Sequence, residues 1–530
     1  MKIAIINTGG TISCVGNPLA PMTASAFAQA SQTLLDPILK QQFAALEPHY
    51  LTDIRFPESA THTLDSTNLQ PSDWCIMALG VLEHYADYDG FVILHGTDSM
   101  DFSGAALSFL LNSVNAQGYP SVVLSKPVII TGSQVPLYYQ AGTSQPLTLN
   151  YNTDAFQNLC GAVAAAQSGI PEVGVYFHNH LYRGNRVVKT NASQFAAFSS
   201  PNYPALGEYG VNLTIDPALC LPGPVHAELG LDNPSQRSTQ IALVRSLQQG
   251  LGDYPVAQLN AFPATYRQNP ASGFLAQLVD AMLAAGARGL ILESYGEGNF
   301  PSGNPDNPAA GAIYQALARA NQAGVNLVNC TQVLAGTVNS SAYAAGAWLP
   351  AVGALAPADM TPMAALAKLM ILMASADEQG WTRQQVQTLL QSNLYGEMSS
   401  VNYLDSRINP ELLANQGLSS LDGSAQLVNC AEQGPLLLAS GHSEPLWRLP
   451  INLHAGDLPG RLRMQDDGNL VFYNRSNQAI WASDTGHFGG ASSRLLLSGS
   501  FANQGADNSL QLQVYDYSAM TCACQLYPVL

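Results

Sequence analysis

Short apolar runs that end in glycine-containing turns recur along the first 200 residues. The runs are Lys2–Asn7, Phe91–Leu94, Val128–Ile130 and Val173–Phe177. Between the second and third runs, apolar residues recur at close to helical spacing from about Phe102 to Val114. Apolar strands that alternate with helices are typical of a parallel sheet covered on both faces. The pattern therefore predicts an α/β fold for the first part of the chain.

A second α/β stretch follows a region rich in proline, asparagine and glycine. Its expected strands are 241–244, 289–293 and 325–329, and its expected helices are 275–285, 309–323, 363–373 and 383–393. From about 432 onward there is no lysine, and short apolar runs alternate with glycine, asparagine and serine, which favours an all-β domain. The expected organisation is an α/β domain at 1–205, a linker at 206–238, a second α/β domain at 239–400, a linker at 401–430 and a β domain at 431–530.

Composition narrows the classes of function. The net charge of −17 lacks the basic excess that nucleic acid or an anionic membrane surface demands. No apolar run is long enough to cross a membrane. The first strand begins at Lys2, which leaves no room for a signal peptide, so we expect a cytoplasmic protein. Most of the eight cysteines stand alone among apolar residues, and no cysteine or histidine spacing predicts a metal site.

Two threonines stand just past apolar strands, each beside glycine. They are Thr11 and Thr97, and ligands of open α/β sheets bind beyond the carboxyl ends of the strands. A threonine hydroxyl needs a base to become a nucleophile, and Asp98 and Lys189 are candidates for proton transfer. Other interpretations stay open: the glycines can form a simple tight turn, Asp98 can cap a helix, and Lys189 can be a solvated loop residue. His95 is expected to bond the backbone rather than to react.

Several motifs occur in the order found in bacterial-type L-asparaginases. They are Thr8–Ile12, Asp65–Thr67, His95–Met100, Thr131–Gln134, Tyr182–Lys189 and Ser294–Asn299. Residues 1–400 resemble this family, and they are most similar to its cytoplasmic, type I branch. The resemblance implies a two-domain asparaginase-like body and hydrolysis of L-asparagine to L-aspartate and ammonia.

The resemblance also assigns catalytic roles. Thr11 matches the nucleophile that forms an acyl-enzyme with the side-chain amide carbon. Thr97, Asp98 and Lys189 match the second catalytic group, which activates a hydroxyl or water through the lysine. The backbone amides of Thr97 and Ser133 match the oxyanion donors, which are aimed where negative charge develops.

Substrate contacts, cofactors and assembly follow in the same way. Asp65 and Ser66 match residues that grip the substrate's α-carboxylate and α-amino groups, Asp98 also contacts the amine, and Gly96 matches a backbone contact. The resemblance implies no cofactor. It implies a homodimer or a homotetramer.

The chain departs from the family at one position close to the nucleophile. Relatives carry a lid tyrosine a few residues after it, whereas Leu19 stands there in this sequence. Either a residue of another loop replaces it, with Tyr138 and Tyr139 as candidates, or the lid works differently.

The last hundred residues carry a separate motif. Five residues alternate along one segment, so a strand would place them on one face: they are Gln465, Asp467, Asn469, Val471 and Tyr473. This segment resembles the mannose-binding motif of bulb-type lectins, whose β-prism has three related units. Only one unit is intact, and Leu510–Tyr515 is similar to a degenerate copy. The resemblance implies weak, monovalent binding of a mannose-type glycan, and the alternative stays open that a lone strand motif serves packing and binds nothing.

Three hypotheses therefore remain. The first is an asparaginase with an appended carbohydrate-binding module. The second is a glycan-binding protein whose asparaginase-like body is a weak catalyst. The third is an amidase with another preference, such as glutamine, because one methylene group discriminates by only about 1–3 kcal/mol.

Overall fold

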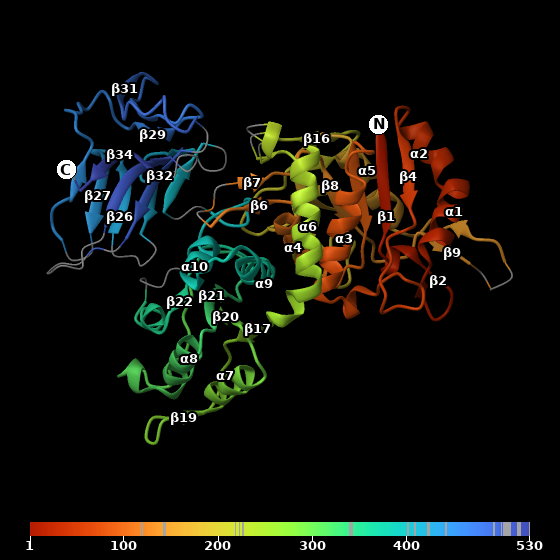
Figure 1. Cartoon of the computed structure of the whole chain (residues 1–530), viewed down its shortest axis with the longest axis horizontal. Helices are drawn as coiled ribbons and strands as arrows, with labels where there is room; N and C mark the ends of the chain where they lie inside the picture. Colours follow the sequence, from red (N-terminus) through yellow and green to blue (C-terminus); the bar gives the residue numbers. More distant parts are fainter. Residues whose placement is uncertain are drawn as a thin grey trace.

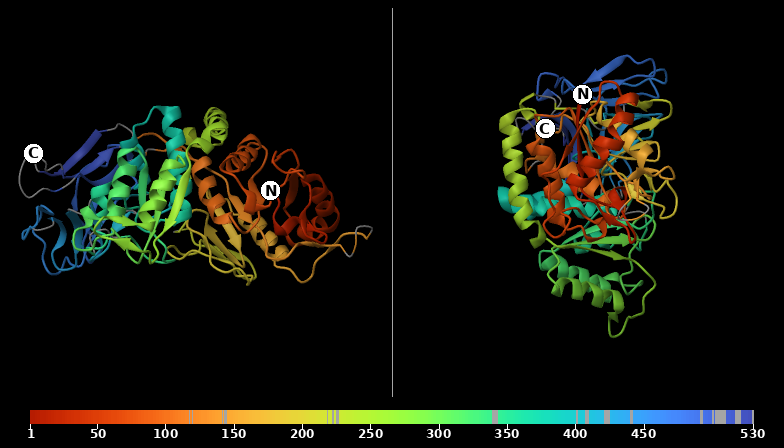
Figure 2. Two further views of the ribbon diagram at one scale, coloured as in Figure 1. Left: turned by 90° about the horizontal axis from the view of Figure 1, so that it is seen from below. Right: turned by 90° about the vertical axis from the view of Figure 1, so that its right-hand side faces the viewer.

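The structure is a computed structural model of the chain. It describes residues 1–530 except 117, 119, 141, 143–144, 218, 222, 225–226, 339–342, 400–401, 407–409, 421–424, 440–441, 491–492, 500, 502–509, 517–520 and 529–530. The first α/β domain and the C-terminal β domain lie toward opposite ends of the long axis, and the second α/β domain lies between them and to one side (Figures 1 and 2).

The first domain is built on an eight-stranded sheet of order β16-β15-β12-β11-β8-β5-β1-β4. Its parallel strands are β1 (Lys2–Asn7), β4 (Glu47–Leu51), β5 (Gly90–Leu94), β8 (Val128–Thr131) and β11 (Val173–Phe177). Its antiparallel edge consists of β12 (His180–Arg183), β15 (Gly207–Tyr209) and β16 (Leu213–Ile215). The carboxyl ends of β1, β5 and β8 are therefore neighbours.

The two faces of this sheet are covered by different helices. Along β1, Ile3 and Ile5 lie in one buried cluster and Ala4 and Ile6 in another, as the two-residue period of a strand requires. The first cluster is closed by α1 (Ala24–Leu34), α2 (Asp36–Gln42) and α5 (Ala155–Ala166), and the second by α3 (Pro71–Glu83) and α4 (Met100–Leu110). The predicted α/β class with a parallel sheet is confirmed.

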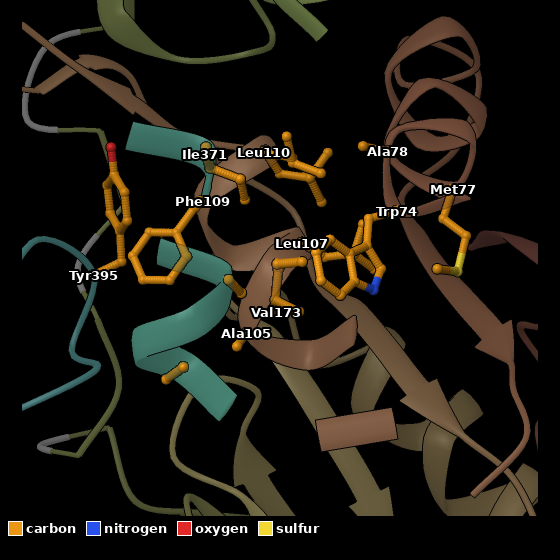
Figure 3. Packing of buried hydrophobic residues seen from close by; sticks show 14 of the residues in the cluster. Trp74, Met77, Ala78, Ala105, Leu107, Phe109, Leu110, Val173, Ile371 and Tyr395 are labelled. Atoms are coloured by element: carbon orange, nitrogen blue, oxygen red, sulfur yellow. The ribbon is translucent and has the colours of Figure 1, made fainter. Parts of the chain in front are cut away.

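The second domain has a smaller parallel sheet, β17-β20-β21-β22. Its elements are β17 (Val256–Asn260), α7 (Phe274–Ala284), β20 (Gly289–Ser294), α8 (Ala312–Gln322), β21 (Asn326–Thr331), β22 (Ala354–Leu355), α9 (Pro362–Gln379) and α10 (Arg383–Leu390). Helix α9 packs on this sheet and also on α4, so Phe109 of α4 and Ile371 of α9 share a cluster with Trp74 of α3 (Figure 3). One of the buried hydrophobic clusters is thus shared by the two α/β domains, while each domain also has a cluster of its own.

Two expectations for the region between the α/β domains were wrong. Residues 241–244 lie in helix α6 (Pro234–Gly250), not in a strand. The helix begins where the Asn233 side chain accepts from Ser235 N and Pro234 occupies the first turn, a strong start signal. The expected linker at 206–238 also contains β15 and β16, which extend the large sheet.

In the residues that the structure describes, the C-terminal part contains three four-stranded antiparallel sheets. They are β23 (Tyr403–Asp405), β32 (Ser493–Ser498), β33 (Gln511–Asp516) and β34 (Thr521–Tyr527); β24 (Glu411–Leu412), β29 (Arg461–Met464), β30 (Leu470–Tyr473) and β31 (Ala479–Ala482); and β25 (Gly417–Ser419), β26 (Ala425–Cys430), β27 (Gly434–Ala439) and β28 (Trp447–Arg448). Leu427, Phe472 and Leu512 from the three sheets meet in one core. The all-β expectation is confirmed, but residues 401–430 are not a linker, because they carry β23 to β26.

The remaining strands are short and form two-stranded antiparallel pairs. They are β2 (Cys14–Val15), β3 (Ala20–Pro21), β6 (Ser113–Val114), β7 (Pro120–Val122), β9 (Tyr138–Tyr139), β10 (Thr148–Leu149), β13 (Val188–Lys189), β14 (Phe198–Ser199), β18 (Tyr266–Arg267) and β19 (Ser272–Gly273). Among the described residues, no helix is both long enough and apolar enough to cross a membrane.

Candidate active site

The turn after β1 is packed against the turn after β5. Gly9 and Gly10 have positive φ angles of 118° and 74°, which favour glycine. A Cβ atom on Gly10 would lie 2.3 Å from the Cα atom of Gly96, so the two turns need glycine where they touch.

The two threonines of this turn have different environments. The buried Thr8 hydroxyl donates to the carbonyl oxygen of Leu94 at 2.8 Å. Thr11 begins the short 3-10 helix Thr11–Ser13 and is only half-buried. Its hydroxyl has no hydrogen-bond partner among the described residues. Thr8 therefore fixes the turn, whereas Thr11 keeps a hydroxyl that can react.

Asp65, Ser66 and Thr67 lie against the same turns. Gly10 N donates to Leu64 O at 2.9 Å, which holds the segment beside the turn after β1. A Cβ atom on Gly96 would lie 2.3 Å from the Ser66 hydroxyl oxygen. Asp65 caps the following 3-10 turn, since its carboxylate accepts from Thr67 N at 3.2 Å.

Thr97, Asp98 and Lys189 form one connected group. Lys189 Nζ lies 2.9 Å from the Thr97 hydroxyl and 2.7 Å from a carboxylate oxygen of Asp98. The other carboxylate oxygen of Asp98 accepts from the Thr67 hydroxyl at 3.1 Å. The hydrogen bond from Lys189 is the main reason that the pKa of Asp98 lies below its usual range. Asp98 therefore stays ionised and holds the ammonium group beside Thr97.

The backbone of Lys189 is held from the other side by Asp101. Lys189 N donates to a carboxylate oxygen of Asp101 at 3.1 Å, and Phe102 N donates to the other at 3.0 Å. Asp101 is buried in the first turn of α4, and burial raises its pKa. The sequence offered no separate signal for this role, because an acidic residue in a first helical turn is ordinary.

The segment that leads to Lys189 is anchored by two buried arginines. Arg183 pairs with Glu172 at 2.8 Å, and Arg186 pairs with Asp359 of the second domain at 2.9 Å. Arg186 also donates to Glu397 O at 2.9 Å and is only 2% exposed. The position of Lys189 thus depends on contacts between both α/β domains.

The turn after β8 completes the group. Asp154 accepts from Gln134 N at 2.9 Å and Val135 N at 3.1 Å, and Asn158 donates to Gly132 O at 2.9 Å. The backbone N–H groups of Thr97 and Ser133 have no acceptor among the described residues. These two donors remain available to a ligand.

His95 is a structural residue, as expected. Its Nδ1 lies 2.6 Å from Gly96 O and its Nε2 lies 2.9 Å from the Ser103 hydroxyl. Complete burial lowers its pKa to about 4, so the ring is neutral near pH 7.

Tyr138 does not replace the missing lid tyrosine. Its hydroxyl lies 2.7 Å from the Ser31 hydroxyl in α1, and its ring packs edge-on against Phe27. Burial also raises the pKa of the Tyr138 hydroxyl above its usual value. Tyr139, the next residue of β9, is exposed, and so is Leu19. The expectation for Tyr138 was wrong because the short strand turns its side chain into the core.

Comparison with known proteins identifies the body that carries this site. Residues 2–219 match the family description "Asparaginase, N-terminal", and residues 271–390 match "Glutaminase/Asparaginase C-terminal domain". The chain is 32% identical to L-asparaginase 1 of Escherichia coli K12 over 399 residues, which is 75% of this chain and 98% of that protein. The chain belongs to the asparaginase family.

Two further relatives define how far this likeness reaches. The crystal structure of L-asparaginase I from Vibrio cholerae matches the asparaginase body with a TM-score of 0.55 and 30% identity, covering 75% of this chain and 99% of that chain. The human 60 kDa lysophospholipase is 34% identical over 369 residues, which is 68% of this chain and 54% of that protein.

The β domain holds a second candidate site, an open pocket of about 410 Å³. Its lining residues are Arg461, Arg463, Gln465, Asp466, Asp467, Tyr473 and Asn477. The five motif residues do not share one strand, because the segment 465–469 is the turn between β29 and β30.

Two of the five motif residues, Asn469 and Val471, do not line the pocket. The side chain of Asn469 accepts from Thr485 N and from the Ser483 hydroxyl, both at 3.2 Å, and Val471 is buried. Of the other three, Gln465 donates to the Tyr473 hydroxyl at 2.6 Å. The alternation of residues in the sequence could not show that the segment 465–469 is a turn rather than part of a strand.

No group of three or more histidine, cysteine, aspartate or glutamate residues is placed to hold a metal ion in the part of the chain that the structure describes. All eight cysteines are free thiols, and burial raises the pKa of Cys14, which lies near Asp65, to about 11. This thiol is therefore protonated near pH 7 and is a poor nucleophile.

Proposed function

We propose that the chain hydrolyses L-asparagine to L-aspartate and ammonia through an ester on Thr11. The Thr11 oxygen bonds to the side-chain amide carbon, and the negative charge that forms on the amide oxygen is stabilised by the N–H groups of Thr97 and Ser133. The carbon–nitrogen bond then breaks, and the nitrogen leaves as ammonia with the proton of the Thr11 hydroxyl. Water hydrolyses the ester and restores the hydroxyl.

Thr97, Asp98 and Lys189 supply proton transfer in this proposal. Lys189 exchanges a proton with the Thr97 hydroxyl at 2.9 Å, while Asp98 balances the charge of the lysine. The single observation that carries the proposal is this group, packed beside the Thr11 turn in a chain of the asparaginase family.

Asp65 and Ser66 would hold the substrate's α-amino and α-carboxylate groups, with Asp98 as a second partner for the amine. Gly96 would contribute its backbone. The geometry that supports these roles is the packing of this segment on the turns after β1 and β5.

Steady-state release of ammonia from L-asparagine tests the proposal. We expect activity for the native chain and a loss of at least about 10³-fold in kcat for Thr11→Ala, because the nucleophile is removed. The matched control is Thr33→Ala, which removes an exposed threonine hydroxyl from α1. An inactive native chain, or a Thr11→Ala variant as active as the control, would refute it.

Substrate preference is tested with the same assay. Asparagine, glutamine and their D-enantiomers are compared by kcat/KM, since one methylene group changes this ratio by only about 10- to 200-fold. A higher kcat/KM for glutamine would mean that glutamine is the preferred substrate, and it would leave the proposed role of Thr11 as nucleophile unchanged.

We propose that the asparaginase body assembles as a homodimer or a homotetramer. Phe262, Tyr295, Val333 and Leu334 follow β17, β20 and β21 and expose apolar side chains at one edge of the second domain. Light scattering at several protein concentrations tests this, and a monomer at all of them would refute it.

A second function, binding of a saccharide, is proposed for the β domain. The supporting observation is that Gln465, Asp467 and Tyr473 line one open pocket and offer amide, carboxylate and phenol groups to sugar hydroxyls. Titration of the full chain with methyl α-D-mannoside, followed by ligand-observed NMR, tests it. Sugar binding without hydrolysis of asparagine or glutamine would favour a glycan-binding protein with a weak catalytic scaffold.

A further inference from the structure

The pocket in the β domain carries two arginines that a neutral sugar does not require. Arg461 and Arg463 alternate with Leu462 and Met464 along β29, and the latter two are buried in the core. Because alternate residues share a face of a strand, both arginines and the following Gln465 face the pocket.

The charge of the two guanidinium groups is only partly balanced. A single carboxylate oxygen of Glu411 lies 3.7 Å from each of them, which is longer than a hydrogen bond. Arg461 also donates to Asn477 Oδ1 at 2.5 Å and lies over the Tyr473 ring at 5.0 Å. The guanidinium group of Arg463 has no hydrogen bond among the described residues.

The pocket is also lined by two acidic residues. Asp466 and Asp467 lie in the turn after β29, and both are exposed. The Gln465 side chain donates to the Tyr473 hydroxyl, and Tyr473 lies opposite Arg461 across the β29–β30 pair. The same pocket therefore offers carboxylate acceptors for hydroxyl groups and guanidinium donors for an anion.

We propose that this pocket binds a saccharide that carries a carboxylate, such as a hexuronate. The carboxylate pairs with Arg463 and Arg461, since planar guanidinium groups bind carboxylates through two parallel hydrogen bonds. The ring hydroxyls donate to Asp466 and Asp467. A simple anion satisfies the arginines but not the aspartates, and a neutral sugar does the reverse. This inference rests on the proposed saccharide binding.

A matched pair of ligands tests the inference on the full chain. Methyl α-D-mannoside and methyl α-D-mannosiduronate differ only in the oxidation of C6, and their Kd values are measured by calorimetry at low and moderate salt. We expect the uronate to bind roughly ten-fold more tightly, with an advantage that shrinks as salt rises.

Three results would overturn the inference, and they differ in what else they affect. Equal or weaker binding of the uronate overturns it but leaves saccharide binding intact. Displacement of bound uronate by equimolar inorganic sulfate would show a site for anions alone. Binding of neither sugar would overturn both proposals.

A variant of Arg463 tests whether this arginine causes the tighter binding of the uronate. Arg463→Gln is expected to lower the ratio of the mannoside Kd to the uronate Kd from about ten to about one, whatever its effect on the Kd of the mannoside. The control is Arg448→Gln, which removes the same charge from β28, outside the pocket. An unchanged uronate advantage in Arg463→Gln would contradict the assignment.

Discussion

The two candidate sites of this molecule are built in opposite ways. The site of the asparaginase body joins turns after three neighbouring strands to the Asp65–Thr67 segment and to Lys189. The pocket of the β domain is lined by residues 461–477, from one hairpin and the turn that follows it. The first site depends on the tertiary fold, and the second is largely local.

The arginines next to the two sites differ in burial and in ion pairing. Arg186 is 2% exposed and pairs with a carboxylate of the other α/β domain. The side chain of Arg463 is 41% exposed and lies 3.7 Å from its nearest carboxylate oxygen. A buried cation in an ion pair fixes distant segments to each other, whereas an exposed one is free to meet a ligand.

The largest effect is expected in the assembled site. Lys189→Met keeps the length of the side chain and removes its charge, so proton transfer to and from Thr97 is lost. We expect kcat for asparagine to fall on the order of 10³-fold. The control is Lys40→Met in α2, where the lysine is exposed. A variant with near-native kcat would show that the lysine only holds the fold.

The buried arginine is expected to matter next. Arg186→Met leaves the carboxylate of Asp359 unpaired, which we expect to lower the free energy of unfolding by about 3–5 kcal/mol. Arg463→Gln, at the exposed position, should change it by less than about 0.5 kcal/mol. Urea unfolding of both variants measures the difference. Equal effects would break the contrast between the two sites.

Much of the assembled site was predictable from the sequence because parallel strands align their carboxyl ends. Thr11 and Thr97 each follow an apolar strand, so the turns that carry them had to meet if those strands were neighbours. The contacts that hold Lys189 were not predictable in this way. Asp101 and Asp359 act through tertiary contacts, and nothing local marks them.

The β domain shows where periodicity fails. The alternation from Gln465 to Tyr473 suits one strand, but Gly468, with a φ of 91°, lies in a tight turn. The strands of this domain that precede residue 431, β23 to β26, are two to six residues long. Their apolar pattern was therefore too short for the strands to be predicted from the sequence. The class of the domain followed from its composition, whereas its boundary did not.

A smaller effect is expected from the residue that holds the backbone of Lys189. Asp101→Ala removes the acceptor for Lys189 N, so the ammonium group is less well placed. We expect kcat to fall about ten-fold, equivalent to about 1.4 kcal/mol, with little change in KM. Asp101→Asn keeps one acceptor oxygen and should recover part of the loss. Asp306→Ala, at an exposed loop position, is the control. A change in KM alone would place Asp101 in substrate binding instead.

The smallest effect is a pH dependence of stability that comes from Asp98. Its pKa is held below the usual range, chiefly by the hydrogen bond from Lys189, so the folded chain binds this proton less readily than the unfolded chain. The stabilisation is therefore complete above the unfolded pKa of about 3.9 and is lost as pH falls toward the folded value. Because the Asp98 side chain is 60% exposed, we expect only a few tenths of a kcal/mol.

Urea unfolding of the native chain and Asp98→Asn between about pH 6 and pH 3 measures this dependence. The difference between the two chains should be constant above about pH 5 and shrink below pH 4. In a Lys189→Met background the shrinkage should nearly vanish, because the main cause of the lowered pKa is gone. A difference that grew as the pH fell would mean that the folded chain protonates Asp98 more easily. Asp98 could then no longer be the ionised partner that holds Lys189 beside Thr97, and the assembled site would lose the feature that most distinguishes it from the open pocket.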